Sequence, residues 1–180
     1  MEVENFVEWI LQVVWEDLAR EGLKNTPERV AKSYDKIFWW YRLKSKDFIT
    51  TFDWEKYDEM IVCKDIEFYS TCEHHMLPFF WMATIWYIPR DKIIGLSKMP
   101  RIVEMFSRRL QNQERLTTQI ADELMEILNP KWVWIIVNAK HLCMMARWIE
   151  KQSSNVTTSC LRWLFRSDWN TRGEFLKFLN

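Results

Sequence analysis

The chain has 180 residues, enough for one domain with a sizeable core or for one domain with a helical appendage. Lysine plus arginine and aspartate plus glutamate both number 25, so no global basic field favours nucleic acid as a partner. No apolar run is long enough to span a bilayer, and the first residues lack the basic start and apolar core of a signal peptide. We therefore expect a cytoplasmic protein with no membrane or nucleic-acid partner, whose four cysteines are thiols or metal ligands.

The first 60 residues predict a helical N-terminal region. Residues 1–20 carry apolar side chains at helical spacing, and Gly22 is placed to end that helix. A second helix is predicted to begin at Thr26 as its N-cap. Residues 43–60 are mixed and polar, which predicts a connector.

From residue 61 the pattern changes, and residues 61–180 predict an α+β domain. Strands are predicted at 61–70, 78–88, 132–137, 145–152 and 156–165, and helices from Ser97 to about Leu110, over 116–128 and over 171–179.

Two short segments hold all three histidines and two of the four cysteines. The first contains Cys72, His74 and His75, and the second contains His141 and Cys143. Thiolate sulfur and imidazole nitrogen are the ligands that zinc takes in proteins. A C-x-x-H pair and an H-x-C pair can therefore supply three zinc ligands and leave two imidazoles beside the ion.

Two kinds of zinc site fit this spacing. Zinc held by Cys72, His75 and Cys143 would keep a water in the fourth position and lower the pKa of that water towards about 7. In the alternative, a closed structural site, His74 or His141 is the fourth ligand. Spacing alone does not separate the two, but two unliganded histidines with none elsewhere in the chain favour catalysis, because imidazole titrates in the working pH range.

The sequence also offers candidate substrate contacts, although no glycine-rich phosphate-binding motif is present. Lys98 and Arg101 lie in the first turn of a predicted helix, where a phosphate would also meet free backbone N–H groups. Glu114 begins the next helix, and its carboxylate either accepts hydrogen bonds from a guanine or pterin edge or only complements the helix dipole. Arg108 and Arg109 are better interpreted as solvated charges on a helix face.

Several motifs together resemble the GTP cyclohydrolase I family, in that family's order and spacing, from about Gly22 onwards. They are Cys72-Glu73-His74-His75, Tyr87-Ile88-Pro89, Ile94-Gly95-Leu96-Ser97-Lys98, Arg101-Ile102-Val103-Glu104, Gln113-Glu114-Arg115-Leu116-Thr117, His141-Leu142-Cys143-Met144-Met145-Ala146-Arg147 and Thr171-Arg172-Gly173-Glu174-Phe175-Leu176.

The resemblance implies a tunnelling fold (T-fold): an antiparallel sheet with two helices on one face, plus a helical N-terminal extension. It also implies a decamer of two stacked pentamers with sites at subunit interfaces. The implied reaction is hydrolysis of GTP at C8 of the guanine, release of formate and rearrangement to 7,8-dihydroneopterin triphosphate, the first step of tetrahydrofolate and pterin biosynthesis.

Roles for individual residues follow from the same resemblance. It implies that Cys72, His75 and Cys143 bind zinc, and that His141 and His74 transfer protons, His141 at N7 of the guanine. The substrate contacts that it implies are Glu114 with Gln113 for the guanine, Leu96, Ser97, Lys98, Arg101 and Arg147 for the ribose and triphosphate, and Arg29 for the phosphates of a neighbouring subunit.

The chain departs from the family in its tryptophans, of which there are 12, against only 3 glycines, where glycine normally makes up about 7% of a chain. Overpacking a core costs about 1–3 kcal/mol per site, so we hypothesise that these tryptophans are an engineered or erroneous feature of the sequence rather than natural design. Tryptophan stands where the family usually has glycine at Trp15, Trp40, Trp81, Trp132, Trp148 and Trp163, and where it usually has a small residue at Trp86 and Trp134.

Three other functions compete with the cyclohydrolase. A zinc nucleobase deaminase is disfavoured because its H-x-E and P-C-x-x-C signature is missing. A T-fold enzyme acting on another purine or pterin would share the fold. A catalytically disabled zinc-binding T-fold oligomer would bind zinc without consuming GTP.

Overall fold

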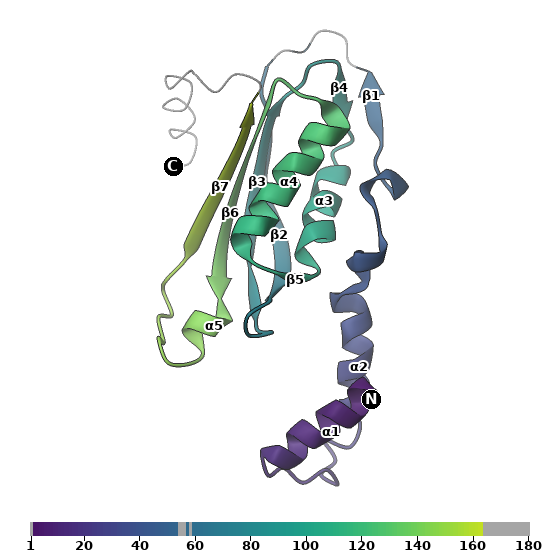
Figure 1. The fold of residues 1–180 in the computed structure, drawn as a ribbon, viewed down its shortest axis with the longest axis vertical. Helices are drawn as coiled ribbons and strands as arrows, with labels where there is room; N and C mark the ends of the chain where they lie inside the picture. The colour runs from purple at the N-terminus through teal and green to yellow at the C-terminus, as the bar shows by residue number, and fades with distance from the viewer. Residues whose placement is uncertain (1, 54–56, 58, 164–180) are drawn as a thin grey trace.

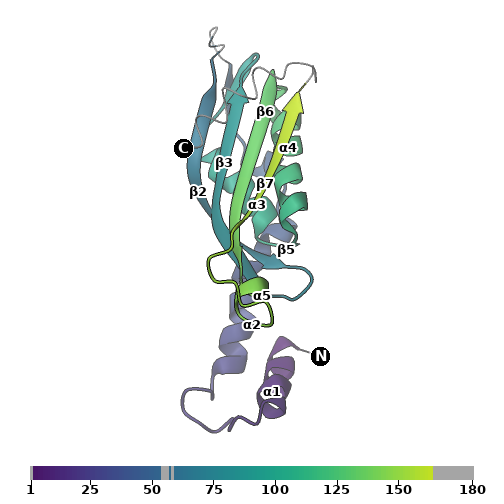
Figure 2. The same cartoon turned by 90° about the vertical axis from the view of Figure 1, so that its left-hand side faces the viewer.

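A computed structural model of the protein describes residues 2–53, 57 and 59–163. A helical N-terminal arm leads into a long five-stranded sheet, with two helices packed on one face of that sheet (Figure 1). In the view turned by 90°, the long strands of this sheet run side by side along the long axis, and the N-terminal helices lie below them (Figure 2). The fold is therefore mixed α+β, as predicted. The predicted closing helix at 171–179 lies outside the described residues.

The N-terminal arm consists of α1 (Val3–Val13) and α2 (Thr26–Ile37), which pack against each other. The helix predicted over residues 1–20 is too long, and Gly22 does not end it. Instead α1 ends at Val13, and Trp15 has a left-handed backbone with φ of 64°. Thr26 is the first residue of α2, so the prediction that it is the N-cap is also wrong by one position.

Two short 3₁₀ turns and a small strand connect the arm to the main sheet. The turns are η1 (Trp39–Arg42) and η2 (Ser45–Asp47), and the strand is β1 (Thr51–Asp53). β1 pairs antiparallel with β4 (Lys92–Ile94), so the predicted connector at 43–60 contains a strand that its polar composition did not indicate.

The main sheet has the order β5-β2-β3-β6-β7, and every pair is antiparallel except β2 with β5. The strand predicted at 145–152 is wrong, because the chain there forms the short helix α5 (Leu142–Met145) and then turns. The other predicted strands are present. The strand bounds are β2 Ile61–Cys72, β3 Pro78–Ile88, β5 Leu110–Gln111, β6 Trp132–His141 and β7 Val156–Trp163.

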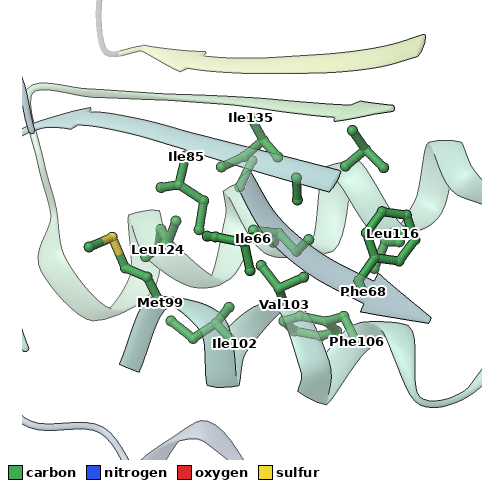
Figure 3. Packing of buried hydrophobic residues seen from close by; sticks show 14 of the residues in the cluster. Ile66, Phe68, Ile85, Met99, Ile102, Val103, Phe106, Leu116, Leu124 and Ile135 are labelled. Atoms are coloured by element: carbon green, nitrogen blue, oxygen red, sulfur yellow. The ribbon is translucent and has the colours of Figure 1, made fainter. Parts of the chain in front are cut away.

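The two helices that cover the sheet are α3 (Lys98–Ser107), which lies over β2, and α4 (Gln113–Leu128), which lies over β6 and β7. Helix α3 is shorter than predicted, because Leu110 belongs to β5 and pairs with Thr71 of β2. The core lies between these helices and the sheet (Figure 3). Its members include Ile66, Phe68, Ile85, Met99, Ile102, Val103, Phe106, Leu116, Leu124 and Ile135.

The opposite face of the sheet carries a second apolar cluster formed by Trp86, Trp132, Trp134 and Ile136. The Trp86 and Trp134 rings lie 5.3 Å apart on register-paired positions of β3 and β6. Trp40 is also buried, in the main core. Four of the tryptophans at small-residue positions are therefore packed side chains, whereas Trp15, Trp81 and Trp148 are exposed. The Trp163 side chain lies outside the described part of the chain. In that described part, no helix combines the length and the apolar character needed to cross a membrane.

Candidate metal centre

Cys72 is the last residue of β2, and a tight loop holds it in place. Its backbone N–H donates to the carbonyl of Leu77 at 2.8 Å, and its carbonyl accepts from the N–H of Met76 at 2.8 Å. The N–H of Glu73 donates to the carbonyl of Gln111 at 3.0 Å, which joins this loop to β5. The loop therefore presents His74 and His75 at one end of the sheet.

The sheet brings a second cysteine to the same place. β6 pairs with β3 as far as His141, and α5 then carries Cys143. One sulfur each from Cys72 and Cys143 and one ring nitrogen of His75 all lie within 4.8 Å of one another. Two thiols and an imidazole are a donor set that fits zinc. Among the described residues no fourth cysteine, histidine or carboxylate joins this group, which favours the open arrangement over a closed structural site.

His141 is held beside this group by two contacts. Its ring stacks on Phe79 with centroids 4.7 Å apart and planes 1° apart. Its Nε2 lies 2.8 Å from Oε1 of Gln113, while Nε2 of Gln113 donates to the carbonyls of Val137 at 2.9 Å and Val156 at 3.0 Å. Since both amide hydrogens of Gln113 are used, its oxygen must accept, and His141 carries its proton on Nε2. The other ring nitrogen, Nδ1, then carries the lone pair and can accept a hydrogen bond.

Burial lowers the pKa of His141, and the nearby Glu114 carboxylate acts in the opposite direction. The neutral ring is therefore the favoured form in the folded chain. His74 is different, because its side chain is 66% exposed. Its Nδ1 lies 3.9 Å from the sulfur of Cys72, so His74 lies at the solvent side of the thiol pair.

A polar network that the sequence did not indicate joins the Cys72 loop to the start of α4. Arg115 binds both carboxylate oxygens of Glu73, at 2.6 and 2.9 Å, and the Asn112 amide donates to the same carboxylate at 3.0 Å. The hydrogen bond from Arg115 is the main cause of the lowered pKa of Glu73. Asn112 also caps α4 by accepting from the N–H of Arg115 at 2.8 Å. The sequence signal that could have indicated the cap is the asparagine just before the predicted helix start, because asparagine is a preferred N-cap residue.

The candidate metal ligands and the two other histidines line a pocket of about 200 Å³. Burial raises the pKa of the Cys143 thiol, the neighbouring Cys72 adds to this effect, and the charge of Arg147 opposes it. The pocket lining consists of Cys72, His74, His75, Gln111, Asn112, Gln113, Glu114, His141, Cys143, Met144 and Val156.

Comparison with known proteins places this arrangement in a family. The family model of GTP cyclohydrolase I matches residues 3–180. The chain is 49% identical over 175 residues to the GTP cyclohydrolase 1 of Wolinella succinogenes, across 97% of this chain and 94% of that relative. It is 46% identical over 178 residues to the GTP cyclohydrolase 1 of Helicobacter acinonychis, across 98% of this chain and 99% of that relative. The chain belongs to the GTP cyclohydrolase I family.

A solved structure of an archaeosine synthase QueF-like protein in the apo form also aligns with the chain. It covers 59% of this chain and 95% of its own, with a TM-score of 0.49 and 17% sequence identity.

Of the contacts that the family resemblance implies for the substrate, the pocket contains Gln113 and Glu114. The described pocket lining does not include the candidates at the start of α3. That end of α3 lies next to β4, whereas the metal group lies at the end of the sheet marked by α5 (Figure 1). A helix of 10 residues spans about 15 Å. The candidates at this remote end are Leu96, Ser97, Lys98 and Arg101.

The two remaining candidate arginines of the family pattern also lie off the pocket lining. Arg29 is exposed on the N-terminal arm and donates to the carbonyl of Gly22 at 2.8 Å and to the Thr26 hydroxyl at 2.9 Å. Arg147 follows α5, and its Nε is buried with no hydrogen-bond partner among the described residues. Its guanidinium carbon lies 4.0 Å from the ring centre of Trp148.

Proposed function

We propose that this chain is a zinc-dependent GTP cyclohydrolase I. It hydrolyses GTP at C8 of the guanine, releases formate, and yields 7,8-dihydroneopterin triphosphate, the first step of tetrahydrofolate and pterin biosynthesis. The observation that carries this proposal is the joining of Cys72, His75 and Cys143 into one ligand group with His141 and His74 beside it. Membership of the family supports the choice of reaction.

Zinc would be held by the two cysteine sulfurs and the His75 ring, and three protein ligands would keep a coordination position for water. When bound, zinc lowers the pKa of that water towards about 7 and so makes a nucleophile available at neutral pH. The ligand group is buried at Cys72 and exposed at His75, so solvent and substrate can reach it from the His75 side.

The two remaining histidines move protons in this proposal. His141 is neutral with its proton on Nε2, and the bond to Gln113 fixes the ring so that Nδ1 is free to accept a proton. A ring fixed by stacking and by a hydrogen bond needs no reorientation when the proton moves. The His74 side chain is 66% exposed, so it can exchange protons with solvent.

The guanine is recognised at the N-terminus of α4. The Glu114 carboxylate is exposed at the pocket, where it accepts hydrogen bonds from the N–H groups of the guanine edge. Gln113 is proposed as its companion in the guanine site. Since its side-chain amide is committed to His141 and to two backbone carbonyls, its contribution to guanine is the placement of His141.

The triphosphate site is proposed to be completed by neighbouring subunits of a T-fold decamer made of two pentamers. Two features support this. The candidates Leu96, Ser97, Lys98 and Arg101 lie at the far end of α3 from the metal group of their own chain. The described sheet also has two open edges, β7 on one side and the part of β2 before β5 on the other, and open edges pair readily with another chain.

The direct test is GTP turnover by the purified chain with and without a chelator, following formate and the fluorescent oxidised neopterin product. Release of both that stops with the chelator and returns with added zinc is the expected result. A matched Cys143→Ser chain tests the ligand assignment and should release neither. Zinc bound at one ion per chain with no formate would instead assign the chain to the catalytically disabled oligomers.

A further inference from the structure

Trp15 occupies a backbone position that helices reserve for glycine. Helix α1 ends in a pair of hydrogen bonds, from the N–H of Glu16 to the carbonyl of Leu11 and from the N–H of Trp15 to the carbonyl of Gln12, both at 3.0 Å. This is the Schellman motif, and Trp15 is its left-handed residue with φ of 64°. Its indole is 95% exposed, so no packing compensates for the unfavourable backbone.

Trp148 is in the same situation elsewhere in the chain. It is the middle residue of a three-residue turn, closed by a hydrogen bond of 2.7 Å from the N–H of Ile149 to the carbonyl of Arg147. Its φ is 56° and its side chain is 80% exposed. A bulky side chain is disfavoured at positive φ, because its Cβ crowds the following carbonyl oxygen.

Among the described residues, two tryptophans and no glycine have the left-handed backbone conformation that glycine usually adopts. Gly22 and Gly95 both have ordinary backbone angles, whereas two tryptophans are left-handed. Four other described residues are left-handed: Asp65 and Asn129, whose short polar side chains tolerate this conformation, and Met76 and Glu150. The whole chain has 12 tryptophans and 3 glycines, where a glycine share of about 7% is usual.

We propose that positions 15 and 148 are glycine in the protein that its own cells make. Those cells would decode as glycine a codon that another genetic code reads as tryptophan. UGA is a codon of this kind, since it is read as stop, as tryptophan or as glycine in different genetic codes. One such codon accounts for a shortage of glycine and an excess of tryptophan at the same time. The buried Trp86 and Trp134 do not carry the inference, because their rings pack together.

A consequence at position 148 rests on the proposed function. The Trp148 ring lies 4.0 Å from the Arg147 guanidinium carbon and covers one face of this cation, whose Nε has no hydrogen-bond partner among the described residues. Glycine at 148 removes that ring. Arg147 is then free to turn towards the triphosphate of the substrate, where a guanidinium binds phosphate oxygens in pairs.

The first experiment compares the gene with the protein from its native cells. The codons at 15 and 148 are determined, and peptides spanning both positions are sequenced by mass spectrometry. UGA codons and peptides that each lack the mass of an indolylmethyl group are the expected result. UGG codons, or peptides that retain tryptophan at both positions, overturn the proposal.

The second experiment uses the recombinant full chain with tryptophan at positions 15 and 148. Trp15→Gly and Trp148→Gly should each raise the denaturant midpoint of unfolding. Trp9→Gly, an exposed site inside α1, is the matched control and should lower it, because glycine weakens a helix interior. Lower midpoints for both Trp15→Gly and Trp148→Gly would contradict the assignment of these two positions to glycine.

Kinetics separate this inference from the proposed function. Trp148→Gly should lower the KM for GTP, whereas Trp15→Gly should leave it unchanged. Formate release with the same KM in both chains contradicts the uncovering of Arg147 and leaves the cyclohydrolase standing. If no chain releases formate, Trp148→Gly included, the proposed cyclohydrolase activity is contradicted. The unfolding midpoints and the peptide masses still test whether positions 15 and 148 are glycine.

Discussion

Nε2 of His141 donates to Oε1 of Gln113 across 2.8 Å, and this bond determines which nitrogen of His141 carries the proton. Gln113 has no rotational choice, because both of its amide hydrogens are bonded to backbone carbonyls of β6 and β7. The sheet thus orients an amide, and the amide orients an imidazole.

Gln113→Leu removes this acceptor and leaves two backbone carbonyls without their side-chain donor. We expect a loss of about 1–3 kcal/mol in the free energy of unfolding for each buried group left unpaired. The kcat should fall, but by less than when a whole acid–base group is lost, which costs about 10²–10⁴-fold. Urea unfolding and steady-state kinetics measure the two effects. Gln152→Leu is the control, since Gln152 is exposed and bonds only one carbonyl. An unchanged kcat in Gln113→Leu would show that His141 needs no such support.

His141→Ala separates proton transfer from metal binding. Because His141 stands outside the Cys72, His75 and Cys143 group, the variant should keep one zinc per chain. Its formate release should fall by about 10²–10⁴-fold, the usual contribution of a general acid–base group. Elemental analysis and formate release are measured on the same sample. Loss of zinc together with activity would make His141 a ligand instead.

Removal of zinc should stop turnover without unfolding the chain. The core lies between the sheet and the helices α3 and α4, and of the three candidate metal ligands only Cys72 belongs to its buried set. Circular dichroism of the chelated chain should therefore retain the spectrum of the loaded chain. The thermal midpoint should fall, because zinc binds the folded state and stabilises it by mass action. Collapse of the spectrum on chelation would mean that the metal is structural.

Arg115→Met tests the network that ties the Cys72 loop to α4. The Glu73–Arg115 pair is partly exposed, with 27% and 45% of the two side chains accessible. Loss of such a solvent-screened pair should change the free energy of unfolding little. We expect weaker zinc binding in a chelator competition, because the loop that carries His75 loses its anchor. Arg108→Met, in a longer pair with Glu104, is the control and should leave zinc binding unchanged. Equal zinc binding by Arg115→Met and the unsubstituted chain would limit the network to fold stability.

Mixing two inactive chains tests whether subunits share a site. His141→Ala lacks the acid–base group, and Lys98→Met lacks a cation at the far end of α3. If a pocket uses Lys98 from a neighbour, unfolding and refolding the two together should restore activity in roughly a quarter of the sites by random assembly in a symmetric oligomer. Each variant refolded alone should stay inactive. No recovery in a mixture of correct size would place Lys98 within its own chain's site or outside the site.

Elements with a strong period and a clear stop could be predicted from the sequence. The apolar period of α4 ends before Asn129 and β3 has its predicted bounds, whereas β6 begins at the predicted residue but continues to His141. The strand predicted at 145–152 is wrong because apolar residues after Cys143 cover a short helix and a turn instead of pairing. The overlong α1 has another cause, since a tryptophan carries no signal for the left-handed turn that ends this helix.

The candidate metal ligands could be selected from the sequence, because a zinc site needs particular residue types at short spacings, and the structure brings these residues together. A thiol and an imidazole three residues apart in one segment, and a second thiol in another, restrict the donor set before any fold is known. What only the tertiary structure decided is their surroundings. The Gln113 bond to His141 and the Glu73–Arg115 pair join residues 28 and 42 positions apart, and only strand pairing and helix packing bring such residues together. The sequence by itself therefore determined a zinc-type donor set with two further histidines, and the fold decided how each of these groups is oriented, because orientation depends on neighbours that are distant along the chain.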